Sequence, residues 1–298
     1  MIAASAMRRV ASSPLRVRST TESRVAGNAM GVRSYSQSQM TEWNATSYHK
    51  VSGPQTSWGQ KVLNRLHVNG DERAIDAGCG SGRLTGELME RLPAGRLIAI
   101  DRSWNMLMTA RANLRPVLGS RVAFAQVSLP DLPFAGWADL VFSTATFHWV
   151  KDHPALFAGI FAALRSGGKL HAQCGGGPNL HRAHELAEQV MHAPPFASHF
   201  TNWPGPWEFA NAAVTADRLA NAGFVDIETN LEEAPTTLAS EEDYREFVTT
   251  VIYHPHLERL PDPALKREFI DRVTGLASKE PVPFTLDYWR LNMQARKP

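Results

Sequence analysis

Short apolar runs alternate with helical repeats through the first part of the chain. Five runs predict strands, at residues 74–76, 97–100, 122–127, 138–143 and 169–173. Between the first two runs, Leu84, Leu88 and Leu92 recur at the four-residue spacing of one helix face. Strands that alternate with helices are typical of a parallel sheet covered on both faces. We therefore predict an α/β fold with a doubly wound, mostly parallel sheet.

The pattern changes beyond residue 180. Helices are predicted at about 181–191, 215–221, 241–254 and 263–277, and strands at 225–229 and 284–294. We expect the later helices to form a cap. A further helix after Pro54 places Trp58, Val62, Leu63 and Leu66 on one face. Ser103, Asp152 and Ser240 have the chemistry of helix N-caps, and Gly167-Gly168 is expected to end the helix that Asp152 begins.

A glycine-rich turn follows the first predicted strand. Asp76 ends the strand, and Gly78, Gly80 and Gly82 occupy alternate positions after it. Glycines suit a turn in which the backbone takes positive φ and approaches a ligand closely. The second strand ends at Asp101, 25 residues after Asp76, where a carboxylate can accept hydrogen bonds from the hydroxyls of a ribose. The alternative is a strand–helix turn with incidental glycines, but the two acids at this spacing favour a nucleoside site.

Four stretches carry a resemblance to a known family: EWNATSYHK, DAGCGSGRLT, FSTATFHWVKDHPALF and DYWRLNMQARK. They resemble the trans-aconitate methyltransferase branch of class I S-adenosylmethionine-dependent methyltransferases, from about Thr41 to the C-terminus. The resemblance implies a Rossmann-like sheet of seven strands, the last antiparallel. It also implies one methyltransferase domain over residues 41–298, with a core at 70–176 and a cap and C-terminal part at 180–298.

The same resemblance implies the cofactor, S-adenosyl-L-methionine, and its site. Asp76 and the glycines would border the methionine half, Asp101 would hold the ribose and Met106 would pack against adenine. Family members often have Asp where this chain has Ser128, so Ser128 or Asp131 would have to replace that contact. The implied cofactor-binding residues are Asp76, Gly78, Cys79, Gly80, Gly82, Asp101, Arg102, Met106, Ser128, Leu129 and Thr144.

The methyl acceptor is expected to be a small molecule, and we favour a carboxylic acid. A carboxylate is ionised at neutral pH and needs no general base, whereas a phenol or alcohol needs one. His148 and Trp149 are the catalytic candidates, and the substrate candidates are Tyr48, His148, Trp149, Tyr253 and Arg290. Tyr48, His148, Tyr253 and Arg290 also have a structural alternative, as core or surface residues. Tyr48, His49 and Gln55 are candidates for a lid over the cofactor.

Charge is unevenly distributed along the chain. Residues 1–40 hold six arginines, no lysine and one acid, Glu22, which is typical of a mitochondrial or plastid transit peptide. The remainder holds 25 basic and 28 acidic residues. We expect a matrix protein processed after Tyr35, or, if Met40 is the true start, a cytoplasmic one. No apolar run is long enough to predict a membrane span. No basic, aromatic stripe typical of a nucleic-acid surface is evident either, and this weakens the alternative of an RNA methyltransferase.

The remaining expectations concern cysteines and partners. Cys79 and Cys174 follow strands separated by one further strand in the family order, about 9–10 Å apart, so we expect two free thiols and no metal site. We expect a monomer or a weak homodimer. The alternative function is a mitochondrial assembly factor that binds the cofactor in the methyltransferase fold without methylating a small molecule.

The targeting expectation can be tested directly. Residues 1–35, fused to a fluorescent protein, should direct it to mitochondria because the segment is basic, serine-rich and nearly free of acids. Fluorescence microscopy provides the readout, and a fusion that begins at Met40 is the control. A diffuse cytosolic signal from the first fusion would favour Met40 as the start of the protein.

Overall fold

The computed structural model describes residues 53–298, with side chains from Ser57 onward. These residues belong to one compact unit, Met40–Pro298. The expected transit peptide, Tyr48, His49 and the side chain of Gln55 lie outside the described residues. None of the described helices is long and apolar enough to cross a membrane.

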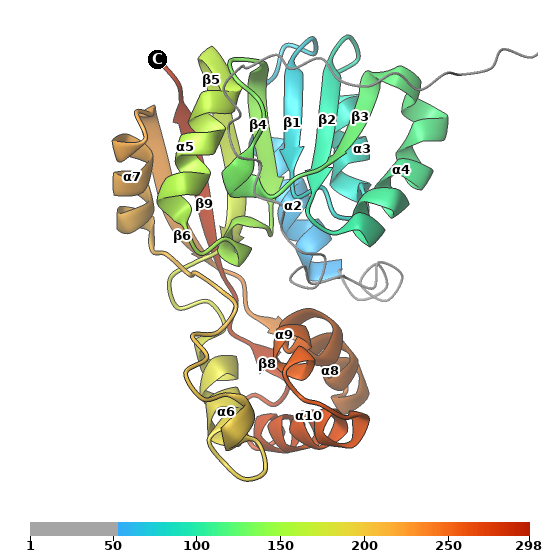
Figure 1. Ribbon diagram of the computed structural model, residues 1–298, viewed down its shortest axis with the longest axis vertical. Coiled ribbons are helices and arrows are strands. Elements are labelled where there is room, and N and C mark those ends of the chain that lie inside the picture. Colours follow the sequence, from blue (N-terminus) through green and yellow to red (C-terminus); the bar gives the residue numbers. More distant parts are fainter. Residues whose placement is uncertain (1–52) are drawn as a thin grey trace, which may run out of the picture. The chain divides into compact units, whose positions relative to one another are not determined.

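A seven-stranded sheet organises the unit (Figure 1), in the order β3-β2-β1-β4-β5-β9-β6. Its strands are β1 (Arg73–Ala77), β2 (Arg96–Asp101), β3 (Val122–Gln126), β4 (Ala138–Thr144), β5 (Leu164–Gly175), β6 (Val225–Glu233) and β9 (Trp289–Arg296). Strand β9 pairs antiparallel with both neighbours, and the other pairs are parallel. The predicted doubly wound sheet with one antiparallel strand is confirmed.

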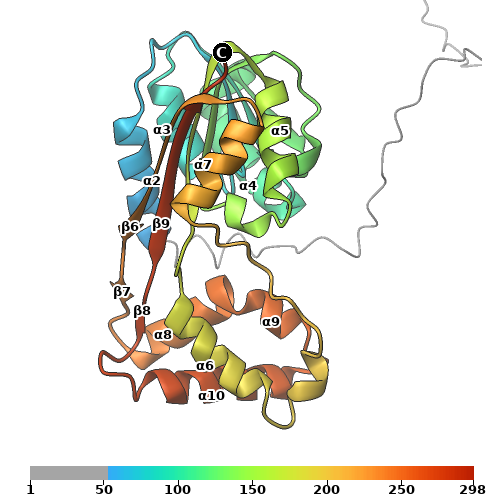
Figure 2. The same ribbon diagram turned by 90° about the vertical axis from the view of Figure 1, so that its left-hand side faces the viewer.

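Helices cover both faces of this sheet (Figures 1 and 2). They are α2 (Gly53–Arg65), α3 (Arg83–Glu90), α4 (Trp104–Leu118), α5 (His153–Ala163) and α7 (Ala212–Asn221). Side chains that alternate along a strand point to opposite faces. Ala74 and Leu97 therefore pack with α2, α3 and α4, whereas Ile75 and Ile100 pack with α5 and α7. The predicted face of α2 is buried as expected.

The cap has a hydrophobic core of its own. It consists of α6 (His181–Met191), α8 (Glu241–Phe247), the π-helix η6 (Val248–Ile252), α9 (His254–Glu258), α10 (Pro263–Ala277) and a two-stranded ribbon of β7 (Thr236–Thr237) and β8 (Thr285–Leu286). Phe196, Phe247 and Phe269 are fully buried there. The single helix predicted at 241–254 is divided, because the chain widens into the π-helix before His254 and Pro255 begin α9.

Local sequence signals account for most element boundaries. Ser103, Asp152 and Ser240 accept hydrogen bonds from the backbone N–H groups of Met106, Ala155 and Asp243, so all three predicted N-caps are confirmed. The expected helix end at Gly167-Gly168 is wrong, because α5 ends at Ala163 and β5 already begins at Leu164. Gly167 instead provides a positive φ of 77° beside an irregularity in the pairing of β4 with β5.

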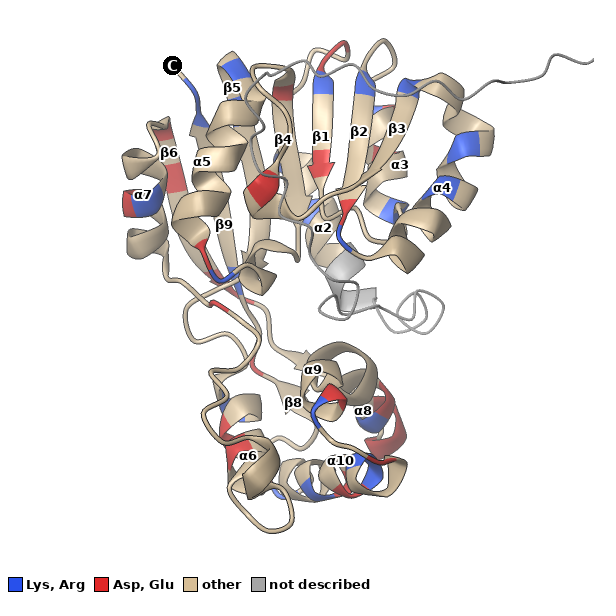
Figure 3. Cartoon of the chain, viewed as in Figure 1, with Lys and Arg blue, Asp and Glu red and all other residues tan. Residues whose placement is uncertain are grey.

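Charges on the cap are interspersed rather than gathered by sign. Figure 3 shows acidic and basic residues side by side on α8 and α10. Arg245 pairs with Asp271 and with Glu241, and Arg272 pairs with Glu268. Both cysteines are free thiols, as expected. Cys79 follows β1 and Cys174 lies near the end of β5, with β4 between those two strands.

Several histidines are buried in this fold. Burial lowers the pKa of His171 and of His184 to about 4, and that of His256 to about 3. Each of them binds a proton more readily in the unfolded chain, where the pKa is about 6.5. The free energy of unfolding contributed by these groups is therefore lost progressively as the pH falls below 6.5. Asp76 has the opposite effect, because burial raises its pKa to about 7.

Because three such histidines outweigh one such carboxyl group, we predict that the melting temperature falls between pH 7.5 and pH 5.5. Circular dichroism during thermal unfolding measures it. His256→Gln removes one titrating group and should shrink the difference between the two pH values, whereas the exposed His192→Gln should leave it unchanged. Equal melting temperatures of the unaltered protein at the two pH values would contradict the prediction.

Candidate active site

A cavity of about 340 Å³ lies at the carboxyl ends of the parallel strands. One half is formed by the segments that follow β1, β2, β3 and β4, and we call it the strand-end half: Gly78, Gly80, Asp101, Arg102, Met106, Val127, Ser128, Leu129, Pro130, Thr144, Ala145 and Thr146. The other half is formed by α2, the turn at residues 148–152, the loops that lead into and out of the cap, the π-helix η6 and β9, and we call it the cap half: Trp58, His148, Trp149, Val150, Lys151, Asp152, Asn179, Leu180, Trp207, Phe209, Val251, Ile252, Tyr288 and Arg290. The carboxyl edge of an open α/β sheet is where such folds bind ligands.

The glycine turn forms one wall of the strand-end half. The N–H groups of Gly78 and Cys79 both donate to the carbonyl oxygen of Ile100, at 2.8 and 2.9 Å. Gly78 has a φ of 84°, and a Cβ there would lie 2.2 Å from Oγ1 of Thr146. Only glycine fits this position, so the backbone itself lines the cavity.

Asp101 joins the turn to the end of β2. Its Oδ2 accepts from Gly80 N–H at 2.9 Å, and its Oδ1 accepts from Ser103 N–H at 2.8 Å. Ser103 in turn caps α4, which carries Met106. These bonds hold the carboxylate at the cavity wall, where it can accept hydrogen bonds from a ligand's hydroxyl groups.

Three residues expected at the cofactor do not reach the cavity wall. Asp76 is 3% exposed and lies below the turn, where Oγ1 of Thr85 donates to its Oδ2 at 2.6 Å. Burial raises its pKa to about 7, against the lowering effect of the Thr85 bond. Gly82 is buried against Ala110 at the start of α3, and Cys79 bonds locally to the carbonyl oxygen of Gly80. Asp76 and Gly82 are buried and support the turn from behind, whereas Cys79 is partly exposed within the turn.

The other residues expected at the cofactor do line the strand-end half: Gly78, Gly80, Asp101, Arg102, Met106, Ser128, Leu129 and Thr144. Asp131 is exposed and is not part of the wall, whereas Ser128 is, so Ser128 is the better placed of the two alternatives. A carboxylate, a hydroxyl group and an apolar Met106 around a glycine turn are a suitable donor, acceptor and packing set for a nucleoside.

His148 lies where the two halves meet. Its Nδ1 accepts from Gly175 N–H at 3.3 Å, which places the proton of the neutral ring on Nε2. Burial, with the positive charge of Arg290 and with His153, holds its pKa well below the usual value. His148 is therefore neutral, with its Nε2–H available as a donor, and its lowered pKa makes it a weak base.

The turn that carries His148 is fixed by a chain of polar contacts that is buried at His153 and partly exposed at Arg218 and Glu208. His153 Nε2 lies 3.1 Å from the carbonyl oxygen of Phe147, and Arg218 Nη1 lies 2.9 Å from His153 Nδ1. Arg218 also donates to Glu208 at 2.9 Å, and Glu208 N–H donates to the carbonyl oxygen of His148. The chain ties α5, α7 and residues 207–209 together, so the position of His148 depends on all three.

Aromatic rings form much of the cap half. The ring of His184 stacks on Trp207 at 4.8 Å and on Phe209 at 5.6 Å between centroids. Trp149 lies 5.6 Å from Trp207, and Phe209 lies 5.7 Å from His148. The result is a continuous wall with little freedom to rearrange, because each ring is held by another.

Arg290 brings a positive charge into this aromatic half. It is 3% exposed, and its guanidinium carbon lies 4.5 Å from the centroid of the Trp58 ring. The ring of Trp58 in turn meets that of Tyr288 edge-on at 4.8 Å. Arg290 is therefore a cavity residue, whereas Tyr253 is not. Tyr253 is fully buried in the cap core, where its hydroxyl donates to the carbonyl oxygen of Ala183 at 2.8 Å.

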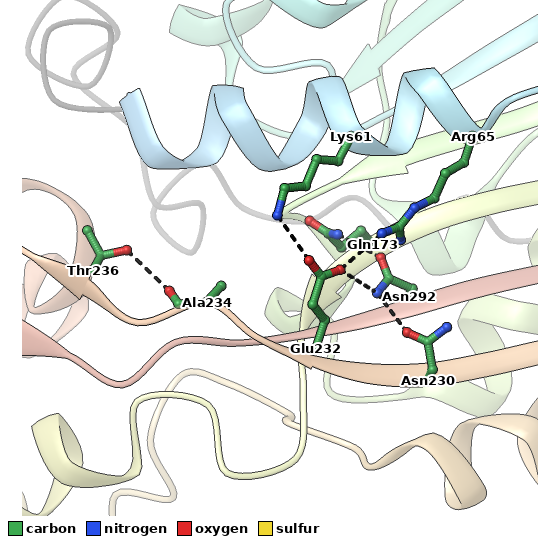
Figure 4. A network of polar contacts seen from close by, with 8 residues as sticks. All are labelled: Lys61, Arg65, Gln173, Asn230, Glu232, Ala234, Thr236 and Asn292. Atoms are coloured by element: carbon green, nitrogen blue, oxygen red, sulfur yellow. Dashed lines mark hydrogen bonds and ion pairs between the residues drawn. The ribbon is translucent and has the colours of Figure 1, made fainter.

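Helix α2, which carries Trp58, is pinned to the sheet by a polar network (Figure 4). Lys61 and Arg65 reach the two carboxylate oxygens of Glu232 at 3.0 and 3.2 Å. The side chain of Asn292 makes two of these bonds. Its Nδ2 donates to Oδ1 of Asn230 at 2.9 Å, and its Oδ1 accepts from Nε2 of Gln173 at 2.7 Å. The two cations lower the pKa of Glu232, so it stays ionised and holds α2, and with it Trp58, over Arg290.

Sequence reasoning missed much of the cap half. Trp58, Trp207 and Tyr288 are absent from the predicted site residues, and Trp58 was expected only on the apolar face of its helix. The signal that could have found Trp207 is the density of aromatic residues in HFTNWPGPW. Asn179, Leu180, Val251 and Ile252 carry no such signal, because ordinary core positions have the same composition.

Known proteins resemble this chain in both sequence and fold. A family model described as a methyltransferase domain matches residues 74–168, from β1 into β5. A trans-aconitate 2-methyltransferase of Deinococcus radiodurans is 28% identical over 242 residues, 80% of this chain and 91% of the relative. One of Methylobacterium nodulans is 30% identical over 200 residues, 67% of this chain and 70% of the relative.

A solved structure shares the fold at low identity. Haemonchus contortus phosphoethanolamine N-methyltransferase 2, in complex with S-adenosyl-L-methionine, has a TM-score of 0.57 and 20% identity. The match covers 88% of this chain but 58% of that enzyme, so this chain spans less than two thirds of its length.

The comparisons favour a methyltransferase over a cofactor-binding assembly factor. The part of the chain that matches the family model includes the glycine turn and Asp101, which lie at strand ends of the seven-stranded sheet. The chain belongs to the class I S-adenosylmethionine-dependent methyltransferases, in the branch of the trans-aconitate 2-methyltransferases.

Proposed function

We propose that this protein transfers a methyl group to a carboxylate oxygen of a small organic acid. The observation that carries the proposal is the buried guanidinium of Arg290 in the cavity wall, beside a His148 that is held neutral. A buried cation attracts an anionic acceptor, and a neutral histidine offers a hydrogen bond without removing a proton. The names of the Deinococcus and Methylobacterium relatives, which refer to trans-aconitate, agree with a carboxylic acid acceptor.

The strand-end half is the proposed cofactor site. When bound, S-adenosylmethionine supplies an electrophilic methyl group on a positively charged sulfur. Asp101 accepts hydrogen bonds from the ribose hydroxyls, and Met106 and Leu129 pack against the adenine. Ser128 hydrogen-bonds the edge of that base. The backbone at Gly78 and Gly80 borders the methionine portion, since their lack of Cβ keeps that wall open.

The proposed reaction needs no general base. One carboxylate oxygen uses an electron pair to form a bond to the methyl carbon, and the carbon–sulfur bond breaks with its electron pair left on sulfur. The products are a methyl ester and S-adenosylhomocysteine, and no proton is released because the acceptor is already ionised above about pH 6. Arg290 and the Nε2–H of His148 hold the carboxylate, and Trp149 and the rest of the aromatic wall keep water out.

This arrangement is poorly suited to a phenol or an alcohol, which must lose a proton during transfer. A base at His148 would become a cation close to Arg290, and the same charge is one reason that the pKa of His148 is low. The most direct experiment incubates a metabolite extract with cofactor that carries a labelled methyl group and identifies the labelled product. Release of S-adenosylhomocysteine with a panel of organic acids separates turnover from cofactor binding alone.

Asp101→Ala should weaken binding of S-adenosylhomocysteine at least about tenfold, the value of losing a hydrogen bond to a charged group. The loss includes the contact to Gly80 N–H that shapes the turn. Calorimetry measures the affinity, and circular dichroism checks that the variant is folded. Glu90→Ala, an exposed acid at the end of α3, is the matched control. Unchanged affinity in Asp101→Ala would remove the proposed ribose contact.

The pH dependence of kcat tests the mechanism. With a carboxylate acceptor and a neutral His148, the profile should be nearly flat above about pH 6. His148→Ala should cost much less than the ~10²–10⁴-fold expected for loss of a general base. His148→Gln, which keeps a donor, should recover part of the loss. A steep rise between pH 6 and 8 that disappears in His148→Ala would instead identify a hydroxyl acceptor.

A further inference from the structure

The cap half of the cavity is predominantly apolar. Besides the ring of His148, five aromatic rings and four aliphatic side chains contribute to its wall: Trp58, Trp149, Trp207, Phe209, Tyr288, Val150, Leu180, Val251 and Ile252. Trp58, Leu180, Ile252 and Tyr288 are also buried from solvent. An acceptor in this half would exchange water for hydrocarbon and ring surface, which stabilises apolar groups and penalises charged ones.

The charged side chains of this half, among its residues that the structure describes, are Lys151, Asp152 and Arg290. Lys151 and Asp152 are exposed, and both make local contacts. Lys151 Nζ donates to the carbonyl oxygen of Trp207 at 2.6 Å, and Asp152 Oδ1 accepts from Ala155 N–H at the start of α5. Arg290 is the buried charge of the group, so the described wall provides one buried cation for an anionic ligand.

The aromatic wall is also rigid enough to select by shape. Trp207 is stacked on His184 and Phe209 and is held through its backbone by Lys151. Phe209 lies between His184 and His148, next to the proposed position of the carboxylate. A wall held by ring stacking on one side and a hydrogen bond on the other has little freedom to open around additional polar groups.

Trans-aconitate, which gives the relatives their name, carries three carboxylates. Burying an ionised carboxylate without a partner costs several kcal/mol, roughly the value of a few hydrogen bonds to charged groups. With one buried cation among its described residues, the apolar cap half suits one carboxylate attached to an apolar body far better than it suits three.

We infer, on the basis of the proposed function, that the methyl acceptor is a monocarboxylic acid with an apolar aliphatic or aromatic body. Arg290 holds the carboxylate beside His148, and the body lies against Trp207, Phe209, Val251 and Ile252. Methylation converts the anion into a neutral ester. The ester loses the charge attraction to Arg290, so it dissociates more readily than the acid does.

The test uses the purified full chain with cofactor that carries a labelled methyl group. The panel contains straight-chain acids from butanoate to decanoate, 3-phenylpropanoate, trans-aconitate and citrate, together with 1-octanol and octanamide as uncharged analogues. We expect kcat/KM to rise about fourfold for each methylene until the cavity is filled, the value of burying one CH₂ group. We expect trans-aconitate to be at least about tenfold poorer than the best monocarboxylate.

Two variants connect the result to the described wall. Arg290→Gln should raise KM for the best monocarboxylate at least about tenfold, and Arg290→Lys should recover part of it while affinity for S-adenosylhomocysteine is unchanged. Trp207→Ala should flatten the dependence on chain length, because it removes the surface that the added methylenes contact. Arg182→Gln, an exposed arginine on α6, is the control and should change neither quantity.

The outcomes separate the two levels of the hypothesis. If trans-aconitate or citrate is methylated more efficiently than every monocarboxylate, the inference of an apolar monocarboxylate is wrong and the proposed carboxylate methylation stands. If 1-octanol or octanamide is methylated and the acids are not, the proposed function itself is wrong. If the acids are methylated with no dependence on chain length, the inferred position of the apolar body is wrong.

Discussion

The hydrogen bond from Gly80 N–H to Asp101 joins the two structural features on which the site depends. It links the glycine turn after β1 to the end of β2, and the carbonyl oxygen of Ile100 reinforces the link by accepting from Gly78 and Cys79. Asp101 also accepts from Ser103 N–H at the start of α4, so one carboxylate sets the turn, the strand end and the helix that carries Met106. The strand-end half of the cavity has its shape because these three elements share that anchor.

The cap half depends on a different constraint, the burial of a charge. Arg290 lies on the antiparallel strand β9, and its guanidinium is covered by the ring of Trp58. Trp58 is held there because α2 is pinned through Glu232 to the neighbouring strand β6. Ion pairs between partly exposed groups contribute little to stability on average. Their importance here is geometric, because they determine which side chain covers the buried cation.

Electrostatics in the centre of the cavity connects the two halves. Arg290 and burial keep His148 neutral, and the Gly175 N–H places its proton on the nitrogen away from β5. A site with a fixed cation and a neutral donor favours an acceptor that brings its own negative charge. In the proposed reaction no proton has to move, which would distinguish this site from those of base-dependent transferases. The polar chain through His153 and Arg218 maintains the geometry from behind.

Much of the fold was predictable from local physics. The signals for the sheet and its flanking helices are local, because each one spans only a few residues. They are the short apolar runs, helix caps such as Ser103 and Asp152, and the glycines at alternate positions after Asp76. The same local signals identified Gly78, Gly80 and Asp101 as residues of the strand-end half. The parallel topology brings those strand ends to one edge, so their proximity is implied once the alternation is recognised.

Most of the cap half was decided by tertiary structure, although His148, Trp149 and Arg290 were predicted as site candidates. More than two hundred residues separate Trp58 from Arg290, and Asn179 and Trp207 lie between them in the sequence. These residues meet because β9 inserts antiparallel beside β5 and because Glu232 on β6 holds α2. The aromatic density near Trp207 does not by itself distinguish a cavity wall from a core, and no pattern near Tyr253 distinguishes a core residue from a ligand contact. A side chain's periodicity shows which face of its element it occupies. Only the packing of distant elements determines whether that face meets the core or a cavity.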